Sequence, residues 1–222
     1  MKILAFESSA KAASVALTDG DRLLSQYFQD SGLTHSRTLL KMAQDMLANT
    51  EQSLQDVDRL AVSVGPGSFT GVRIGVAAAK GLAWGADLPI CGVSTLEAMA
   101  SLPEIEGVIL CPVMDARRSQ IYNAKFEYRG GSLVRLCDDR ALSIAELAEE
   151  ARVSARPFCL LGDGAELCFP LLPNAVLAPK ALRQQSAYGV SLAALHCDAT
   201  DVSALVPVYL RPSQAERELG KK

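Results

Sequence analysis

Glycine and small hydroxyl residues gather in one stretch of the chain whose composition suits anion binding. The sequence GPGSFTG at 65–71 follows the apolar run at 60–64 and contains Ser68 and Thr70. A glycine turn that leads into a helix presents free N–H groups and a partial positive charge, which can bind a phosphate. The spacing is neither the dinucleotide-binding pattern nor a Walker loop, and no Lys-Ser/Thr pair follows. It favours the alternative, a structural turn with close helix packing.

Histidine and cysteine could hold a metal or act as nucleophiles, but neither shows a metal-binding spacing. The only histidines are His35 and His196, and the sequence contains no HxxxH or HExxH. A two-histidine metal site therefore cannot be inferred. The cysteines show no CxxC, and three lie inside apolar runs. They are typical of small buried residues in a reducing compartment.

Charge and hydropathy argue against a protein that binds nucleic acid by bulk charge and against a secreted or membrane-spanning protein. A formal net charge of −3 over 222 residues argues against a protein that binds nucleic acid by bulk charge alone. The apolar run near the start, 3–6, is interrupted by Glu7 and is too short for a signal peptide. No apolar run approaches a membrane span. These features predict a cytoplasmic protein.

The first half of the chain alternates strands and helices around the glycine turn. Two tight turns near the start predict an antiparallel strand meander. Ser94 and Glu97 have the spacing of a capping box, which marks a helix start. The elements predicted here are strands at 2–7, 12–18, 22–28, 60–64 and 88–93, and helices that begin at 34–36, 68–70 and 94–97.

The second half repeats this order of elements. Its predicted strands lie at 108–114, 119–128, 132–137 and 158–161, and its helices at 143–152 and 186–197. Prolines predict a loop between 170 and 179. Two halves with one order of elements indicate a weak internal repeat, with a mostly parallel sheet and covering helices in each. The crevice between the halves is then the expected ligand site.

One long motif resembles a known family. GPGSFTGVRIG at 65–75 is similar to the signature of the TsaB family, also called YeaZ, of bacterial tRNA threonylcarbamoyladenosine biosynthesis proteins. The resemblance covers essentially the whole chain. It extends through AFESSAKAASVAL near the start, THSRTLL at the first helix, GVSTLEAMA at 92–100, MDARRSQIYNAKF at 114–126 and PVYLRP near the end.

The resemblance implies an α/β fold with two actin-like lobes, in the glycoprotease-like branch of the sugar-kinase-like (ASKHA, ribonuclease H-like) fold. Each lobe then has a mixed sheet with helices. The expected boundaries are 1–103 for an N-terminal lobe that carries partner-binding helices and 104–222 for a smaller C-terminal lobe. The tail, from about 206 to 222, is expected to pack back on the first lobe.

The resemblance also implies a function and a set of partners. A non-catalytic subunit of this kind binds TsaD, which transfers threonylcarbamoyl from its adenylate to N6 of the adenosine next to the anticodon of tRNAs that read ANN codons. The ATPase TsaE joins the two proteins, a homodimer uses the same helices, and tRNA is contacted indirectly through the complex. The alternative is an independent ATPase, kinase-like enzyme or peptidase of the same fold.

The expected partner interface lies on the first two helices of the N-terminal lobe. Their apolar and small residues recur at three- and four-residue steps, the spacing of one helix face. The expected interface residues are Leu39, Ala43, Met46 and Leu47 on the first helix and Gly71, Arg73, Gly75, Ala78 and Leu82 on the second. Arg73, Ala77, Lys80 and Trp84 share another face of the second helix.

The metal and nucleotide sites of catalytic relatives look reduced. Such relatives hold a metal through two histidines four residues apart, whereas His35 is followed by Leu39. We therefore expect no metal, no transfer chemistry and a helix-start or packing role for His35. A degenerate nucleotide site is favoured, with no cofactor; weak or partner-dependent binding of ATP or ADP is the alternative. Its expected residues are Glu7, Ser8 and Ser9 in a first phosphate hairpin, Asp115 in a second, and Gly162 and Gly164 in an adenosine-side turn.

Overall fold

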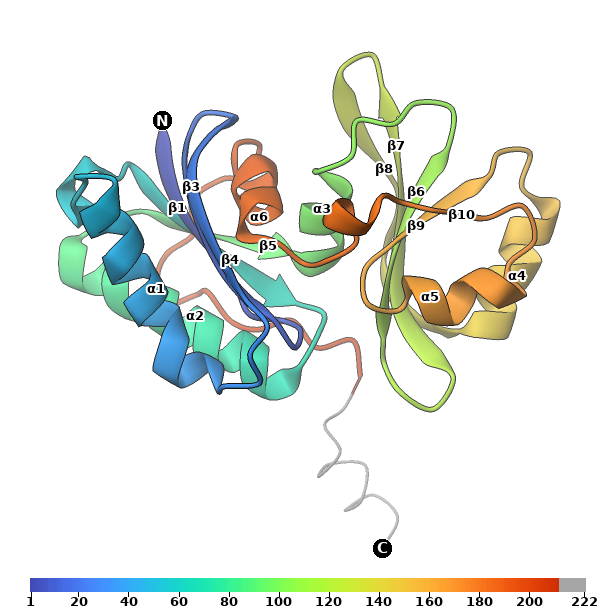
Figure 1. The fold of residues 1–222 in the computed structure, drawn as a ribbon, viewed down its shortest axis with the longest axis horizontal. Coiled ribbons are helices and arrows are strands. Elements are labelled where there is room, and N and C mark those ends of the chain that lie inside the picture. The colour runs from blue at the N-terminus through green and yellow to red at the C-terminus, as the bar shows by residue number, and fades with distance from the viewer. Residues whose placement is uncertain (212–222) are drawn as a thin grey trace, which may run out of the picture.

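Two lobes stand side by side, each with a five-stranded mixed sheet (Figure 1). The computed structural model describes residues 1–211. The N-terminal elements are β1 (Lys2–Glu7), β2 (Ala13–Asp19), β3 (Arg22–Gln29), α1 (His35–Asn49), the 3-10 helix Leu54–Asp56, β4 (Arg59–Gly65), α2 (Phe69–Ala86), β5 (Ile90–Ser94) and α3 (Thr95–Ala100). The later elements are β6 (Ile109–Asp115), β7 (Gln120–Arg129), β8 (Ser132–Ser143), α4 (Ile144–Val153), β9 (Phe158–Leu161), α5 (Ala165–Cys168), the 3-10 helices Phe169–Leu171 and Lys180–Leu182, β10 (Val176–Leu177) and α6 (Ala187–Ala194).

The two sheets share one topology. The first has the order β3-β2-β1-β4-β5, and the second, read in the same sense, has the order β8-β7-β6-β9-β10. In each sheet the first three strands pair antiparallel and the last two are added in parallel. This duplication confirms the predicted internal repeat and the two-lobed α/β fold.

Helices cover both faces of the first sheet. Side chains of β1 alternate, so Leu4 and Phe6 pack towards α1 and α2, whereas Ile3 and Ala5 pack towards α6. In Figure 1, α1 and α2 lie on the outer side of the molecule, and α6 and α3 lie between the two sheets. The inner layer is thin because small residues meet there, and a Cβ at Gly189 of α6 would overlap the Ala98 carbonyl oxygen.

The chain returns to the first lobe before it ends, which corrects the boundary expected from the sequence. The segment expected as the second lobe, 104–222, contains α6, yet α6 packs on the first sheet. Ser191 of α6 hydrogen-bonds Thr18 of β2 at 2.5 Å between the hydroxyl oxygens. The expected tail also reaches the first lobe, since the Val208 N–H donates to the Val64 carbonyl at 2.7 Å. The rest of that tail, 212–222, lies outside the described residues.

The local predictions agree with the structure at some helix starts and differ from it at other positions. Ser68 caps α2 by accepting from the Gly71 N–H, whereas Thr34 precedes α1 without a side-chain capping bond. Ser94 caps α3, but the Glu97 carboxylate does not complete the box. The strand expected at 132–137 continues to Ser143, and β10 lies within the stretch expected as a loop. Both additions depend on pairing with β7 and β9, which local sequence does not encode.

Polar contacts join α3 of the first lobe to β8 of the second. The Arg135 guanidinium donates to Glu97 at 2.6 Å and to Asp139 at 2.7 Å. The Ser94 hydroxyl donates to Asp139 at 2.5 Å. Glu97 is therefore used between the lobes, which explains why it does not complete the capping box of α3.

Candidate partner surface and interlobe hollow

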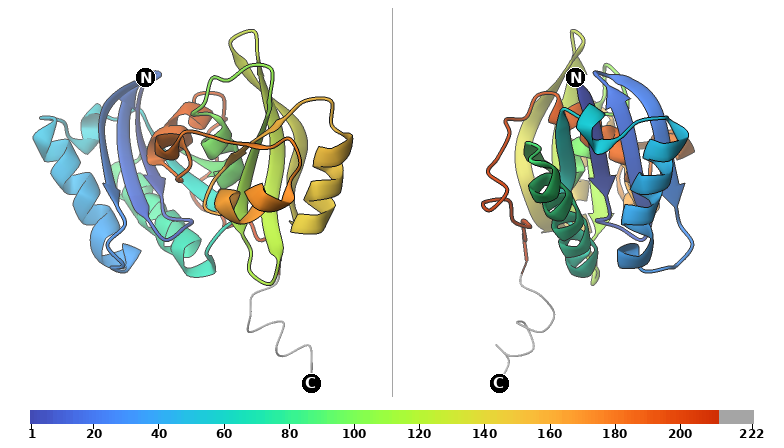
Figure 2. Two further views of the ribbon diagram at one scale, coloured as in Figure 1. Left: turned by 45° about the vertical axis from the view of Figure 1, so that its right-hand side comes forward. Right: turned by 90° about the vertical axis from the view of Figure 1, so that its left-hand side faces the viewer.

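Helices α1 and α2 lie side by side on the outer face of the first sheet (Figure 2, right). Six of the nine residues expected at a partner interface are buried inside this lobe in the isolated chain. They are Leu39, Ala43, Met46, Leu47, Gly71 and Gly75. Their spacing marks the face of each helix that the chain's own sheet covers. Of the remaining three, Arg73 is exposed, whereas Ala78 and Leu82 are half-buried.

The glycine stripe of α2 receives the turn after β1. A Cβ at Gly71 would overlap the Ser8 carbonyl oxygen, and a Cβ at Gly75 would overlap Ser8 Oγ. The Ser8 hydroxyl donates to the Gly71 carbonyl at 2.9 Å, and the Ser68 N–H donates to the Ser9 carbonyl at 2.7 Å. The expectation of close packing was therefore right, but the neighbour is this turn and not another helix.

The opposite side of α2 is exposed and carries small residues next to one tryptophan. We call Ala77, Gly81, Trp84 and Gly85 the outer face, because their spacing places them on one side of the helix. Trp84 is 76% exposed. A Cβ at Gly81 or Gly85 would meet nothing within 4 Å. Glycine inside a helix costs about 1 kcal/mol relative to alanine, and no intrachain contact at these positions requires it.

Gly81 and Gly85 are absent from the residues expected at the interface. Their signal was present in the sequence, because they share three- and four-residue steps with Ala77 and Trp84. Sequence spacing could not show which of the two small-residue stripes on α2 faces outwards.

Glu7, at the end of β1, hydrogen-bonds the turn that follows this strand. It is fully buried, and its Oε1 accepts from the Ser9 N–H at 2.5 Å. The second carboxylate oxygen and the hydroxyls of Ser9 and Ser63 have no hydrogen-bond partner among the described residues. Burial raises the pKa of Glu7 above its ordinary value of 4.5, and the hydrogen bond from the Ser9 N–H only partly opposes this.

Glu7→Gln is expected to remove a loss of stability that sets in as the pH rises. The folded state with a raised pKa holds its proton longer than the unfolded state, so its contribution is complete below pH 4.5 and is lost as the pH rises through the raised pKa. A glutamine amide can also donate to Ser9 or Ser63. We expect the variant to be more stable by about 1 kcal/mol at pH 8.

The measurement is denaturant unfolding of both proteins at several pH values. The difference in free energy of unfolding should shrink towards about pH 5. A difference that stays constant with pH, or one that favours the wild type at pH 8, would contradict the role assigned to Glu7.

A hollow of about 720 Å³ lies between the lobes. The turn after β1 and the N-terminus of α2 form one wall, and the β6–β7 turn forms the other. Its lining residues are Ser9, Ala10, Lys11, Gly67, Ser68, Phe69, Thr70, Met114, Asp115, Ala116, Arg117, Arg118, Tyr122 and Asp163. Its basic side chains and the free N–H groups at the start of α2 suit an anion, whereas the two aspartates oppose one.

Only two of the six residues expected at a nucleotide site, Ser9 and Asp115, line this hollow. Glu7 and Ser8 are buried beneath the turn. Gly162 and Gly164 pack against β6, because a Cβ at Gly162 would overlap the Val113 carbonyl oxygen and one at Gly164 would lie 3.1 Å from the Met114 carbonyl carbon. These four expected positions are structural in this fold.

The β6–β7 turn places side chains in the wall of the hollow. Arg117, Arg118 and Ser119 have consecutive positive φ angles of 63°, 58° and 57°. Asp115 is used within the turn, since its Oδ1 accepts from the Arg117 N–H at 2.7 Å. Lys11, Arg117 and Arg118 were not among the expected site residues, since only the tertiary structure brings them together.

His35 has the structural role expected of it. Its Nε2 lies 2.9 Å from the Ala10 carbonyl oxygen, which ties the start of α1 to the turn after β1. Within residues 1–211, no three His, Cys, Asp or Glu side chains are grouped so as to hold a metal ion. Among the helices described, none is long and apolar enough to cross a membrane.

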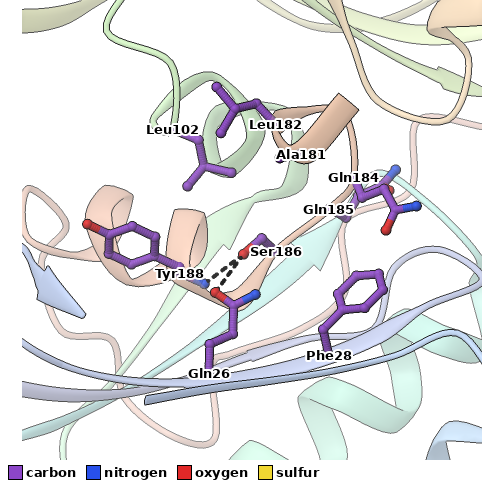
Figure 3. Close-up of a pocket in the computed structure, with 9 residues that line it drawn as sticks. All are labelled: Gln26, Phe28, Leu102, Ala181, Leu182, Gln184, Gln185, Ser186 and Tyr188. Carbon is purple, nitrogen blue, oxygen red and sulfur yellow. Dashed lines mark hydrogen bonds between the residues drawn. The ribbon is translucent and has the colours of Figure 1, made fainter. Parts of the chain in front are cut away.

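A second hollow, of about 300 Å³, lies where α6 begins, beside β3 (Figure 3). The Ser186 hydroxyl donates to Gln26 Oε1 at 3.3 Å and accepts from the Tyr188 N–H at 3.2 Å. Amide, hydroxyl and apolar side chains line this hollow, without a charged group. No motif in the sequence indicated it.

Comparison with known proteins identifies the family. A family model described as tRNA N6-adenosine threonylcarbamoyltransferase matches residues 29–217. The tRNA threonylcarbamoyladenosine biosynthesis protein TsaB of Bacillus subtilis is 34% identical over 97% of this chain and 96% of its own length. The chain belongs to the TsaB family. This confirms the resemblance carried by GPGSFTGVRIG.

Further relatives agree with this assignment. TsaB of Escherichia coli is 41% identical over 57% of this chain and 55% of its own length. The solved structure of YeaZ from Pseudomonas aeruginosa superposes with a TM-score of 0.81 at 27% identity, covering 94% of this chain and 99% of that one. The TsaB relatives are named for tRNA threonylcarbamoyladenosine biosynthesis, which confirms the expected pathway, and the YeaZ match confirms the expected actin-like fold.

Proposed function

We propose that this chain is a non-catalytic subunit of threonylcarbamoyladenosine synthesis that binds TsaD through the outer face of α2. The observation that carries the proposal is the pair of outward glycines, Gly81 and Gly85, next to the exposed Trp84. Glycine costs helix stability here, and no contact within the chain explains it. A partner helix that approaches the backbone closely would explain it.

The exposed side chain of Trp84 also favours the outer face of α2 as the binding surface. A tryptophan side chain buries a large apolar area when it is covered, and tryptophan is enriched among residues that dominate interface energies. Trp84 is 76% exposed in the isolated chain, so most of that area is available to a partner. The other three residues of the expected interface, Arg73, Ala78 and Leu82, stay in the proposal as flanking positions. The six buried residues do not.

The non-catalytic role rests on the histidines. His35 is engaged by the Ala10 carbonyl, and His196 is exposed just beyond α6. Two histidines on separate elements do not form the pair that holds the metal in the catalytic relatives. We therefore propose that TsaD supplies the transfer chemistry, and that this chain makes TsaD competent in the cytoplasm.

We propose roles for TsaE, tRNA and a second copy of the chain from the same surface. TsaE is proposed to join the assembled pair, and tRNA to be contacted indirectly through it. A homodimer through the outer face would compete with the TsaD complex, because both would cover the same side of α2. The concentration of each partner then decides which form dominates.

Reconstitution tests the proposal. Purified chain, TsaD and TsaE are combined with tRNA and threonylcarbamoyl-adenylate, and each protein is omitted in turn. We expect a stable complex with TsaD on size exclusion, and modified tRNA only when both proteins are present. Modification by TsaD and TsaE without this chain, or by this chain without TsaD, would contradict the proposal.

Nucleotide binding in the interlobe hollow is the second candidate. It is favoured by the start of α2 and the basic side chains of the hollow, and it includes the alternative of an independent ATPase or kinase-like enzyme. Titration of the isolated chain with ADP, together with an assay of ATP turnover, tests it. Sustained turnover by highly purified chain would favour an enzyme over a subunit.

A further inference from the structure

Residues 201–211, which we call the strap, begin with a hydrogen-bonded turn at 201–205 and then run along α2 on the side away from α1 (Figure 2, right, red). The Lys80 ammonium donates to the Ser203 carbonyl at 3.2 Å and to the Leu205 carbonyl at 2.9 Å. Further along, the Val208 N–H donates to Val64 at the end of β4. The strap is therefore docked on the first lobe at several points.

Two leucines of the strap enter different apolar clusters. Leu205 is 5% exposed and belongs to the core beneath α1 and α2. A Cβ at Gly92 would lie 2.7 Å from Leu205 Cδ1, so β5 leaves room for this side chain. Leu210 packs against the cluster that contains Met99 of α3 and Leu110 of β6. The strap thus reaches from the core of one lobe to apolar side chains shared by both.

An aromatic stack fixes the strap between these two anchors. The Tyr209 ring lies on the Phe69 ring, with centroids 4.4 Å apart and planes 10° apart. Arg73 Nε donates to the Tyr209 hydroxyl at 2.6 Å, and the Arg73 guanidinium carbon lies 5.4 Å from the Tyr209 ring centroid. Tyr209 is therefore held on α2 by stacking, a hydrogen bond and a cation–π contact.

The strap also contacts the second lobe. The Arg211 guanidinium donates to the Ala116 carbonyl of the β6–β7 turn at 2.8 Å. Phe69, beneath Tyr209, and Ala116 both line the interlobe hollow, on opposite walls. Strap residues 209 to 211 therefore span the rim of the hollow from one lobe to the other.

We infer that the strap is a clamp between the lobes, which holds the β6–β7 turn at the first lobe and limits opening of the hollow. Relative motion of two lobes is the default when a fold has a crevice between them. The contacts of α3 with β8 restrain one part of the interface, and the strap restrains the rim of the hollow. The clamp belongs to the isolated chain, so it does not depend on the proposed partner.

Hydrogen exchange of the full-length chain, followed by mass spectrometry, tests the clamp. Arg211→Ala removes the contact to Ala116 without touching either core. Loss of one charge-assisted hydrogen bond is expected to speed amide exchange in peptides covering 114–122 about tenfold. Tyr209→Ala, which removes the stack that positions Arg211, is expected to act on the same peptides.

Two controls separate the clamp from general loosening. Arg37→Ala removes an exposed arginine from α1, and Val206→Ala shortens a strap side chain that is 61% exposed. Both should leave exchange in 114–122 within about twofold of the wild type. Arg211→Ala combined with Phe69→Ala should accelerate exchange less than the product of the single effects, because both changes release one clamp.

Two results of the exchange measurement would contradict the clamp. Exchange in 114–122 that stays within twofold of the wild type in Arg211→Ala would show that the strap does not hold the turn. So would an acceleration in Arg37→Ala as large as that in Arg211→Ala. If Tyr209→Ala unfolds, the outcome for Arg211→Ala decides alone.

Discussion

Gly71→Ala is expected to lower the free energy of unfolding by about 2 to 4 kcal/mol, a large effect for one methyl group. The new Cβ would overlap the Ser8 carbonyl oxygen. That oxygen belongs to backbone held between β1 and α2, so it cannot rotate away as a flexible side chain would. Either α2 lifts from the sheet or the turn after β1 moves, and both changes disturb a packed core. Urea unfolding followed by circular dichroism measures the loss.

The same helix supplies the matched control. Gly81→Ala makes the same substitution where the new Cβ meets nothing within 4 Å. Because alanine favours helix over glycine, this variant should be more stable than the wild type by about 0.5 to 1 kcal/mol. Equal losses in the two variants would contradict the division of α2 into an inward and an outward glycine stripe.

Ala77→Glu is expected to weaken binding to TsaD by about 100-fold and to abolish tRNA modification at low protein concentration. Ala77 is exposed in the isolated chain, so the fold should tolerate the substitution. At the centre of a close helix contact, the carboxylate would be buried without a partner, which opposes association. Titration calorimetry and a modification assay measure the two effects.

Two further variants sharpen this test. Ser132→Glu adds the same charge to an exposed position of β8 in the second lobe and should leave binding unchanged. Gly81→Ala should weaken binding while it stabilises the isolated chain, because a methyl group would keep a partner backbone at a distance. Full binding by both Ala77→Glu and Gly81→Ala would remove the outer face from the interface.

Local sequence carried much of the fold. Alternating strands, the glycine turn and the helix starts at Ser68 and Ser94 depend on near neighbours, so their positions could be predicted within a few residues. The repeated order of elements predicted two similar lobes. The signature at 65–75 was enough to indicate the family, because so long a motif rarely arises by chance.

Contacts between distant segments decided what the sequence could not. Helix α6 packs on the first lobe, where Ser191 hydrogen-bonds Thr18. Strand β10 forms by pairing with β9. The strap could be expected only as a tail that packs back. Its stack on Phe69 and its contact with Ala116 join segments more than 90 residues apart in sequence, for which spacing carries no signal.

The two glycine stripes of α2 show this division most clearly. The sequence by itself determined that α2 is a helix with small residues at three- and four-residue steps, and that the chain belongs to the TsaB family. It could not determine which stripe faces the chain's own turn and which is exposed, because both have helical spacing. Only the tertiary structure decided this, since the Ser8 backbone and side chain occupy the space beside Gly71 and Gly75, whereas Gly81 and Gly85 stay open.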